Sequence, residues 1–169
     1  MQATYLDNAS TAFPKAPQVA DAVRDYILNT GCNVGRGEYA QAYSAAEMVF
    51  DTRELLCDLF HFPSPKNVAF TMNITQSLNY IMKGLLHSGD HVLVSSMEHN
   101  AVMRPLTQLL DCGVSFTRMP CNEYGELLLD GLDALVQPNT RAVIMMHASN
   151  VCGTLMPIRE VSAFCKKHH

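Results

Sequence analysis

The chain has 169 residues, the length of one ordinary domain and enough to bury a hydrophobic core. Hydrophobic residues make up 48% of it, which excludes an intrinsically disordered chain, and a net charge of −4, from 12 basic and 16 acidic residues, gives no basic surface for nucleic acid or for an anionic membrane. The chain has no run of about 18 apolar residues, and "MQATYLDNAS" lacks the layout of a signal peptide, so we expect a cytoplasmic protein without a membrane span.

The first third of the chain predicts two helices joined by a glycine-rich loop. The first helix covers residues 14–31, with Pro17 in its first turn and Gly31 at its end. Its apolar face consists of Val19, Val23, Tyr26 and Ile27. The loop "CNVGRGEY" leads to a second helix from Ala40 to Phe60, which "FPSPKN" ends. The apolar positions of this helix are Ala45, Val49, Leu55, Leu56 and Leu59.

The remaining two thirds alternate between short apolar runs and helical patterns. Strands are predicted at 67–71, 91–96, 114–119 and 141–147, and helices at 74–86, 100–110, 129–136 and 158–169. This alternation predicts an α/β fold with parallel strands. The pattern ends within a helix, with no stop signal after His169, so we expect a chain cut within its fold, with another strand to follow.

Six cysteines are spread along the chain, and no two of them form a C-x-x-C pair. Some lie within apolar patterns, as buried reduced thiols do. We therefore expect the mainly structural thiols of a cytosolic protein and not a disulfide framework.

Polar residues gather at three of the four predicted strand ends, where open α/β sheets bind their ligands. At the first end, Asn73 is placed to cap the helix that begins at Ile74, so that the backbone N–H groups of Ile74, Thr75 and Gln76 point out of the helix start. Such N–H groups and the helix dipole attract a phosphate, and Thr75 adds a hydroxyl. On this motif alone, a plain helix cap is the preferred interpretation.

His99 follows the second strand end in "SSMEHNA", between an acid and an amide. Two interpretations fit it: a structural turn histidine, or a flat imidazole that stacks on an aromatic cofactor. A metal site would recruit Glu98, His87, His91 or His147, but the spacing of these residues matches no zinc motif, so we expect no metal. Asn150, in "HASNVCGTLMP" after the fourth strand, either starts a turn or hydrogen-bonds a ligand hydroxyl.

Five segments in this order resemble the class V aminotransferase and cysteine desulfurase family, whose members use pyridoxal phosphate on the fold type I scaffold. They are "YLDNASTAFPK", "NVGRGEY", "FTMNITQSLN", "GDHVLVSSMEHNAVMRP" and "HASNVCGTLMPI". The resemblance implies a three-layer, mainly parallel sheet, with residues 1–30 as an N-terminal arm and helix and residues 31–169 as the first part of the cofactor-binding large domain. It also implies a homodimer.

The resemblance implies roles for individual residues. The loop of Asn73, Ile74 and Thr75 would bind the cofactor phosphate, and His99 would stack on the pyridine ring and take part in proton transfer. Asn150 would hydrogen-bond the phenolic oxygen of the cofactor. The residues near the substrate entrance would be Asp7, Asn8, Ala9, Ser10, Asn33 and Arg36.

The lysine that forms the Schiff base with the cofactor in this family lies downstream of the "SNV-G" motif, and none of the five lysines here occupies its position. The strand at 67–71 would also lack its partner, which is a late antiparallel strand in this family. The resemblance therefore implies the N-terminal half of an enzyme, inactive by itself, whose first-choice reaction is C–S cleavage of cysteine. The alternative reactions are class V transamination and selenocysteine cleavage. The alternatives of another class are a non-catalytic split-gene binding partner and an unrelated phosphate-binding domain.

Overall fold

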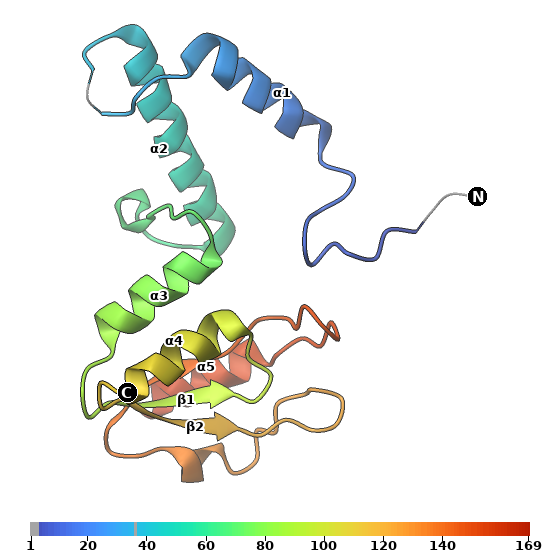
Figure 1. Ribbon diagram of the computed structural model, residues 1–169, viewed down its shortest axis with the longest axis vertical. Coiled ribbons are helices and arrows are strands. Elements are labelled where there is room, and N and C mark those ends of the chain that lie inside the picture. Colours follow the sequence, from blue (N-terminus) through green and yellow to red (C-terminus); the bar gives the residue numbers. More distant parts are fainter. Residues whose placement is uncertain (1–3, 36) are drawn as a thin grey trace. The chain divides into compact units, whose positions relative to one another are not determined.

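The computed structural model describes residues 4–35 and 37–169 (Figure 1). The predicted substrate-entrance residue Arg36 therefore lies outside the described residues. The chain forms two compact units, one ending at Phe70 and one comprising Thr71–His169. Each unit is described by itself below, and the domain boundary expected at residue 30 stays a prediction.

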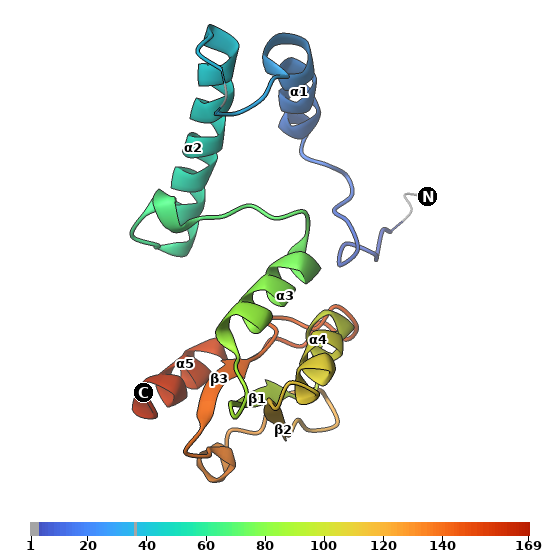
Figure 2. The ribbon, with the colours of Figure 1, turned by 60° about the vertical axis from the view of Figure 1, so that its left-hand side comes forward.

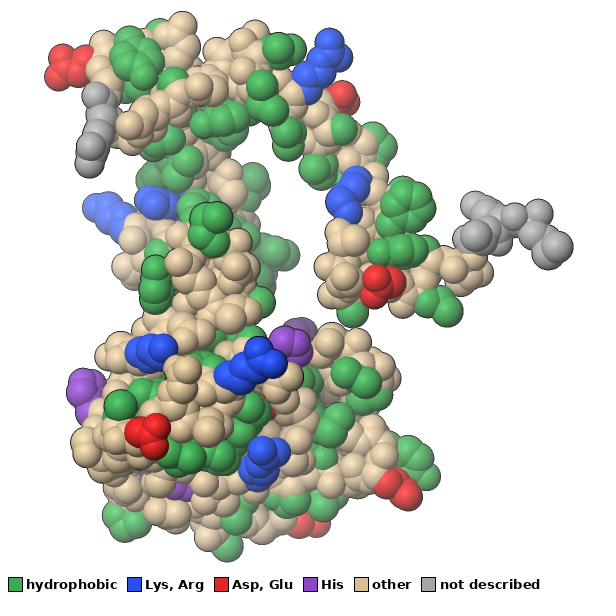
Figure 3. Space-filling view, in the orientation of Figure 1, with side chains coloured by type: hydrophobic (Ala, Val, Ile, Leu, Met, Phe, Trp, Pro, Cys, Tyr) green, Lys and Arg blue, Asp and Glu red, His purple; other side chains and the backbone are tan. Residues whose placement is uncertain are grey.

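The unit that ends at Phe70 contains the two predicted helices. Helix α1 spans Pro17–Asp25, with the proline at its first position, and a π-helical turn, η1 (Tyr26–Thr30), continues it to Gly31. The predicted apolar face is present but not covered, since Val19, Val23 and Ile27 are 50%, 54% and 68% exposed. Figure 3 shows hydrophobic side chains along this helix in green.

Helix α2 spans Ala40–Phe60, the bounds predicted from its sequence. It ends where His61 adopts the left-handed conformation, with φ at 52°. Ala42, Ala45 and Cys57 are its buried residues, whereas the predicted apolar positions Leu55 and Leu59 are exposed. The pattern therefore predicted the helix and the burial of Ala45 correctly, but not the exposure of Leu55 and Leu59.

The strand predicted at 67–71 is wrong. Pro65–Asn67 form a short 3-10 turn, η2, and the chain then runs without regular structure until α3 begins. The backbone at Val68 is extended, with φ at −91° and ψ at 115°, but the three strands of the described residues pair only with one another. A β-strand needs a neighbour to bond its N–H and C=O groups, and an apolar sequence alone does not supply one.

The second unit is built on a parallel sheet of three strands in the order β2-β1-β3 (Figure 2). These are β1 (His91–Ser95), β2 (Ser115–Met119) and β3 (Thr140–Ile144), and Leu93 of β1 lies opposite Thr117 and Val143. Every residue of the central strand β1 is buried. The parallel pairing confirms the predicted α/β class.

Helices cover both faces of this sheet. On one face, α3 (Ile74–Leu85) and α4 (Asn100–Leu110) enclose a core with Val92 and Val94. On the other, η3 (Leu132–Leu135) and α5 (Ile158–Lys167) pack against Leu93. The helix predicted at 129–136 is thus a short 3-10 turn, and the three predicted layers are present.

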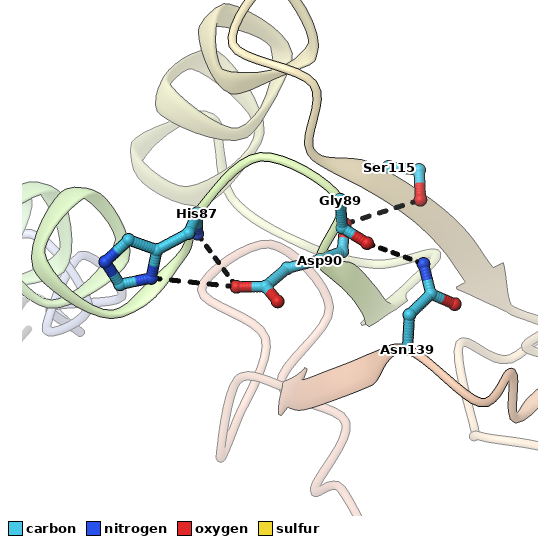
Figure 4. Close-up of polar contacts among 5 residues, drawn as sticks. All are labelled: His87, Gly89, Asp90, Ser115 and Asn139. Carbon is cyan, nitrogen blue, oxygen red and sulfur yellow. Dashed lines mark hydrogen bonds and ion pairs between the residues drawn. The ribbon is translucent and has the colours of Figure 1, made fainter.

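The amino end of the sheet is closed by hydrogen bonds, which Figure 4 shows around the turn between α3 and β1. The Asp90 carboxylate accepts the backbone N–H of His87 at 2.8 Å, and the Asn139 amide donates to the Gly89 carbonyl at 2.7 Å. The Ser115 hydroxyl also donates to the backbone carbonyl of Asp90. These contacts join the starts of all three strands, so the open loops lie at the opposite, carboxyl end.

None of the helices in the described part of the chain is both long enough and apolar enough to span a bilayer.

Candidate cofactor site

Helix α3 begins with a reciprocal cap. The Asn73 Oδ1 atom accepts the Gln76 backbone N–H at 2.9 Å, and the Gln76 Oε1 atom accepts the Met72 backbone N–H at 2.8 Å. Asn73 therefore caps the helix as the sequence predicts. The Gln76 backbone N–H is used in this cap, however. The N–H groups that remain available to bind an anion at the helix start are therefore those of Ile74 and Thr75.

His99 caps the next helix, α4. Its Nδ1 atom accepts the Ala101 backbone N–H at 3.0 Å, which places the proton of the neutral ring on Nε2. The ring is exposed at the surface. The structural interpretation of this histidine therefore holds for one nitrogen, while Nε2 is available for other chemistry.

The acid before His99 has a structural role. The Glu98 Oε1 atom accepts the Ser95 hydroxyl and the Met146 backbone N–H, each at 2.6 Å. This carboxylate ties the end of β1 to the segment that follows β3. It fixes the peptide that carries His99 and is not a free ligand.

The other histidines considered for a metal site lie apart from this one. His91 is 1% exposed, with Nδ1 2.8 Å from the Thr140 hydroxyl and Nε2 2.9 Å from the Thr117 hydroxyl. Burial lowers the pKa of His91, because the charged form of the ring is disfavoured inside the sheet. Within residues 4–35 and 37–169, no three His, Cys, Asp or Glu side chains gather as a metal would need.

The structure brings Thr75 and His99 into one groove of about 410 Å³ between α3 and α4. The two helices lie side by side in both ribbon views (Figures 1 and 2). The groove is lined by Thr75, Asn79, His99, Asn100, Ala101, Arg104, Pro105 and Gln108. A hydroxyl, a helix start and an exposed imidazole thus share one cavity.

Asn150 does not line this groove and lies exposed in the turn after β3. The turn is organised by buried Ser149, whose hydroxyl accepts the backbone N–H groups of Val151 and Cys152, and by Gly153 at a φ of 76°. Asn8, Ala9 and Asn33 are exposed residues of the unit that ends at Phe70, so the groove in Thr71–His169 is formed without them. Asn8 accepts the Phe13 backbone N–H through its side chain.

Two residues were not singled out from the sequence. Arg104 lines the groove from the second turn of α4. Hydrogen bonds from Ser149 and then Thr154 lower the pKa of the exposed Cys152 thiol to about 7. The signal at Arg104 is not local, because it depends on how the fold places α3 beside α4. The signal at Cys152 is local, since Ser149 and Thr154 lie within three residues of it in the sequence.

Residues 4–169 match the sequence pattern of the family Aminotransferase class-V, and the chain belongs to that family. A Pseudomonas aeruginosa protein described as "Probable cysteine desulfurase" is 33% identical over 162 residues, which cover 94% of this chain and 40% of that protein. A protein of the same description from Halalkalibacterium halodurans is 28% identical over 169 residues, 97% of this chain and 41% of its own.

A solved structure gives the same result. The cysteine desulfurase CsdA of Escherichia coli, in an S-sulfonic acid form, has a TM-score of 0.79 and 27% identity over 96% of this chain and 42% of that one. The predicted fold type I scaffold and the predicted family are therefore confirmed. The chain spans about 40% of the length of the curated relatives it matches.

Proposed function

We propose that this chain supplies the N-terminal part of a pyridoxal-phosphate enzyme that acts on an amino acid, with cysteine desulfurase-like C–S cleavage as its reaction. The observation that carries the proposal is the single groove that joins Thr75, at the start of α3, to His99, at the start of α4. The resemblance to proteins named cysteine desulfurase supports the choice of reaction and of cysteine as substrate.

The residues of the groove fit such a cofactor at both of its ends. The free N–H groups of Ile74 and Thr75, the Thr75 hydroxyl and the positive end of the α3 dipole suit a phosphate. The exposed imidazole of His99 suits a flat aromatic ring. When bound, pyridoxal phosphate supplies an electron-withdrawing ring that stabilises negative charge on the substrate.

His99 then acts in two ways. Its Nδ1 atom stays bonded to the Ala101 N–H, which holds the ring in one orientation and one tautomer. Its Nε2 atom carries the proton and is the atom that donates it or takes it back. The cap on one nitrogen thus prepares the other for proton transfer.

Roles for residues outside the groove belong to the same proposal. Asn150 would hydrogen-bond the phenolic oxygen of the cofactor, and Asn8, Ala9, Asn33 and Arg36 would lie near the substrate entrance. Assembly as a homodimer and a cytoplasmic location complete it.

Cofactor binding and turnover by the 169-residue chain test the proposal. None of its five lysines lines the groove, so we expect pyridoxal phosphate to bind noncovalently, with an absorbance band that dialysis removes and borohydride does not trap on the protein. We expect no cysteine-dependent sulfide release from the chain alone.

Each other outcome has a distinct meaning. Covalent trapping by borohydride would show that one of these lysines reaches the cofactor. Release of a keto acid in place of sulfide and alanine would favour an aminotransferase, and release of selenide alone a selenocysteine lyase. Failure to bind pyridoxal phosphate at all would overturn the proposal and favour a non-catalytic binding partner.

A further inference from the structure

The groove between α3 and α4 carries two facing rows of polar side chains. Asn100, Arg104 and Gln108 recur every four residues on α4 and so form one row, and Thr75 and Asn79 do the same on α3. Below them the two helices meet through apolar residues such as Met82, Val102 and Leu106. Polar lining above an apolar helix contact is a feature that packing between the helices does not require.

Arg104 is the cation of this groove, and it has no anion. No Asp or Glu lines the groove, and the three ion pairs found in the described ranges involve Asp90 and Asp133 but not Arg104. The side chain is exposed and makes no hydrogen bond to the described residues. Its planar group of five N–H donors is therefore available to a ligand.

Arg104 and the start of α3 belong to the same cavity. Thr75 lines the groove together with Arg104, which lies five residues beyond His99 and so about 7 Å along the axis of α4. The cap leaves two backbone N–H groups at the start of α3, enough to hydrogen-bond a phosphate but without a full positive charge to balance it. An arginine on the facing helix supplies that charge.

We propose that Arg104 is a phosphate-binding residue of this groove, acting from α4 opposite Thr75 and the start of α3. It pairs with the phosphate through two parallel N–H···O contacts, the geometry that guanidinium and phosphate groups favour. The proposal rests on the proposed function only for the identity of the molecule that carries the phosphate.

Substitution of Arg104 in the full chain tests the proposal, with Arg141→Gln as the matched control. Arg141 is an exposed arginine of β3 that does not line the groove, so its substitution removes the same charge elsewhere. The probes are inorganic phosphate, pyridoxal phosphate and pyridoxal, with calorimetric and absorbance titrations as readouts. Because Arg104 is exposed, Arg104→Gln should change the folding equilibrium by no more than about twofold, which converts to about 0.5 kcal/mol in the free energy of unfolding.

We expect Arg104→Gln to weaken the binding of inorganic phosphate and of pyridoxal phosphate by about tenfold or more, as loss of a charge-assisted hydrogen bond does. Pyridoxal, which has no phosphate, should bind equally to both proteins. Arg104→Lys should recover part of the affinity, because it restores the charge but not the paired contacts. Arg141→Gln should bind all three probes as the unsubstituted chain does.

Equal phosphate affinity in Arg104→Gln and Arg141→Gln would overturn the inference. If pyridoxal phosphate still bound to the unsubstituted chain in that case, the proposed function would survive alone. If inorganic phosphate bound through Arg104 while pyridoxal phosphate did not bind, the inference would stand and the proposed function would fail. If neither inorganic phosphate nor pyridoxal phosphate bound to the unsubstituted chain, both the inference and the proposed function would be overturned.

Discussion

His91 begins strand β1 and His99 caps the helix after it, and the two histidines have different surroundings. His91 is buried at the amino end of the sheet, with a threonine hydroxyl at each ring nitrogen. His99 is exposed at the carboxyl end, with one nitrogen bonded to a backbone N–H and the other open. A histidine whose hydrogen bonds are all made inside a sheet stabilises the fold, and one with a free nitrogen beside a groove is available for chemistry.

The largest expected effect comes from substitution of each histidine by alanine. His91→Ala removes a buried ring and leaves the hydroxyls of Thr117 and Thr140 without that partner, so the free energy of unfolding should fall by roughly 3 kcal/mol. His99→Ala loses a helix cap and should cost about 1 kcal/mol. Urea unfolding followed by circular dichroism measures the free energy of unfolding of both variants. Equal losses in the two variants would contradict the different roles assigned to His91 and His99.

The pH dependence of stability sharpens the same contrast. Burial lowers the pKa of His91 below its ordinary value of 6.5, so between that value and its lower folded one the unfolded chain binds more protons. Stability from this group is therefore complete above pH 6.5 and falls as the pH drops below it, with a slope of up to about 1.4 kcal/mol per pH unit. Urea unfolding between pH 5 and 8 measures this slope, and we expect it to be absent from His91→Gln and unchanged in His99→Ala.

Asp133 does not interfere in that range. Its hydrogen bonds to Lys167 and then His168 hold its pKa below the ordinary value of 3.8. The stability that it contributes is therefore present above 3.8 and is lost only as the pH falls below that value. A slope that persisted in His91→Gln between pH 5 and 6.5 would show that another group is responsible.

The smallest expected effect compares two exposed cysteines, Cys152 in the turn after β3 and Cys112 after the end of α4. With its pKa lowered to about 7, the Cys152 thiol is about half ionised at pH 7, whereas an ordinary thiol is a few per cent ionised. Cys152 should react with iodoacetamide several-fold faster than Cys112, as measured by peptide mass spectrometry. Ser149→Ala should slow the reaction of Cys152 and leave that of Cys112 unchanged. Equal reaction rates of Cys152 and Cys112 in the unsubstituted chain would contradict the lowered pKa of Cys152.

The regular parts of the fold could be predicted because their signals are local. Helices α2 and α4 have the predicted bounds, and the buried run of β1 and the cap at Asn73 are both readable in a few residues. The strand at 67–71 was wrong because a strand is completed by a partner that its own sequence does not contain.

The candidate site was only partly predictable for the same reason. Thr75 and His99 follow different strands, and the parallel topology brings their loops to one end of the sheet. Arg104 has the sequence appearance of any charged residue on an exposed helix face. What distinguishes it is that it lines the same groove as Thr75, in which no Asp or Glu of the described residues takes part, and that depends on how α3 and α4 pack.

The carboxylate of Glu98 couples two loops that are far apart in the sequence. Through Ser95 and Met146 it sets the spacing between the peptide that carries His99 and the segment that leads to Asn150. A change of length or composition in either loop would therefore be transmitted to the other. A change in one loop should therefore be tolerated only with a compensating change in the other.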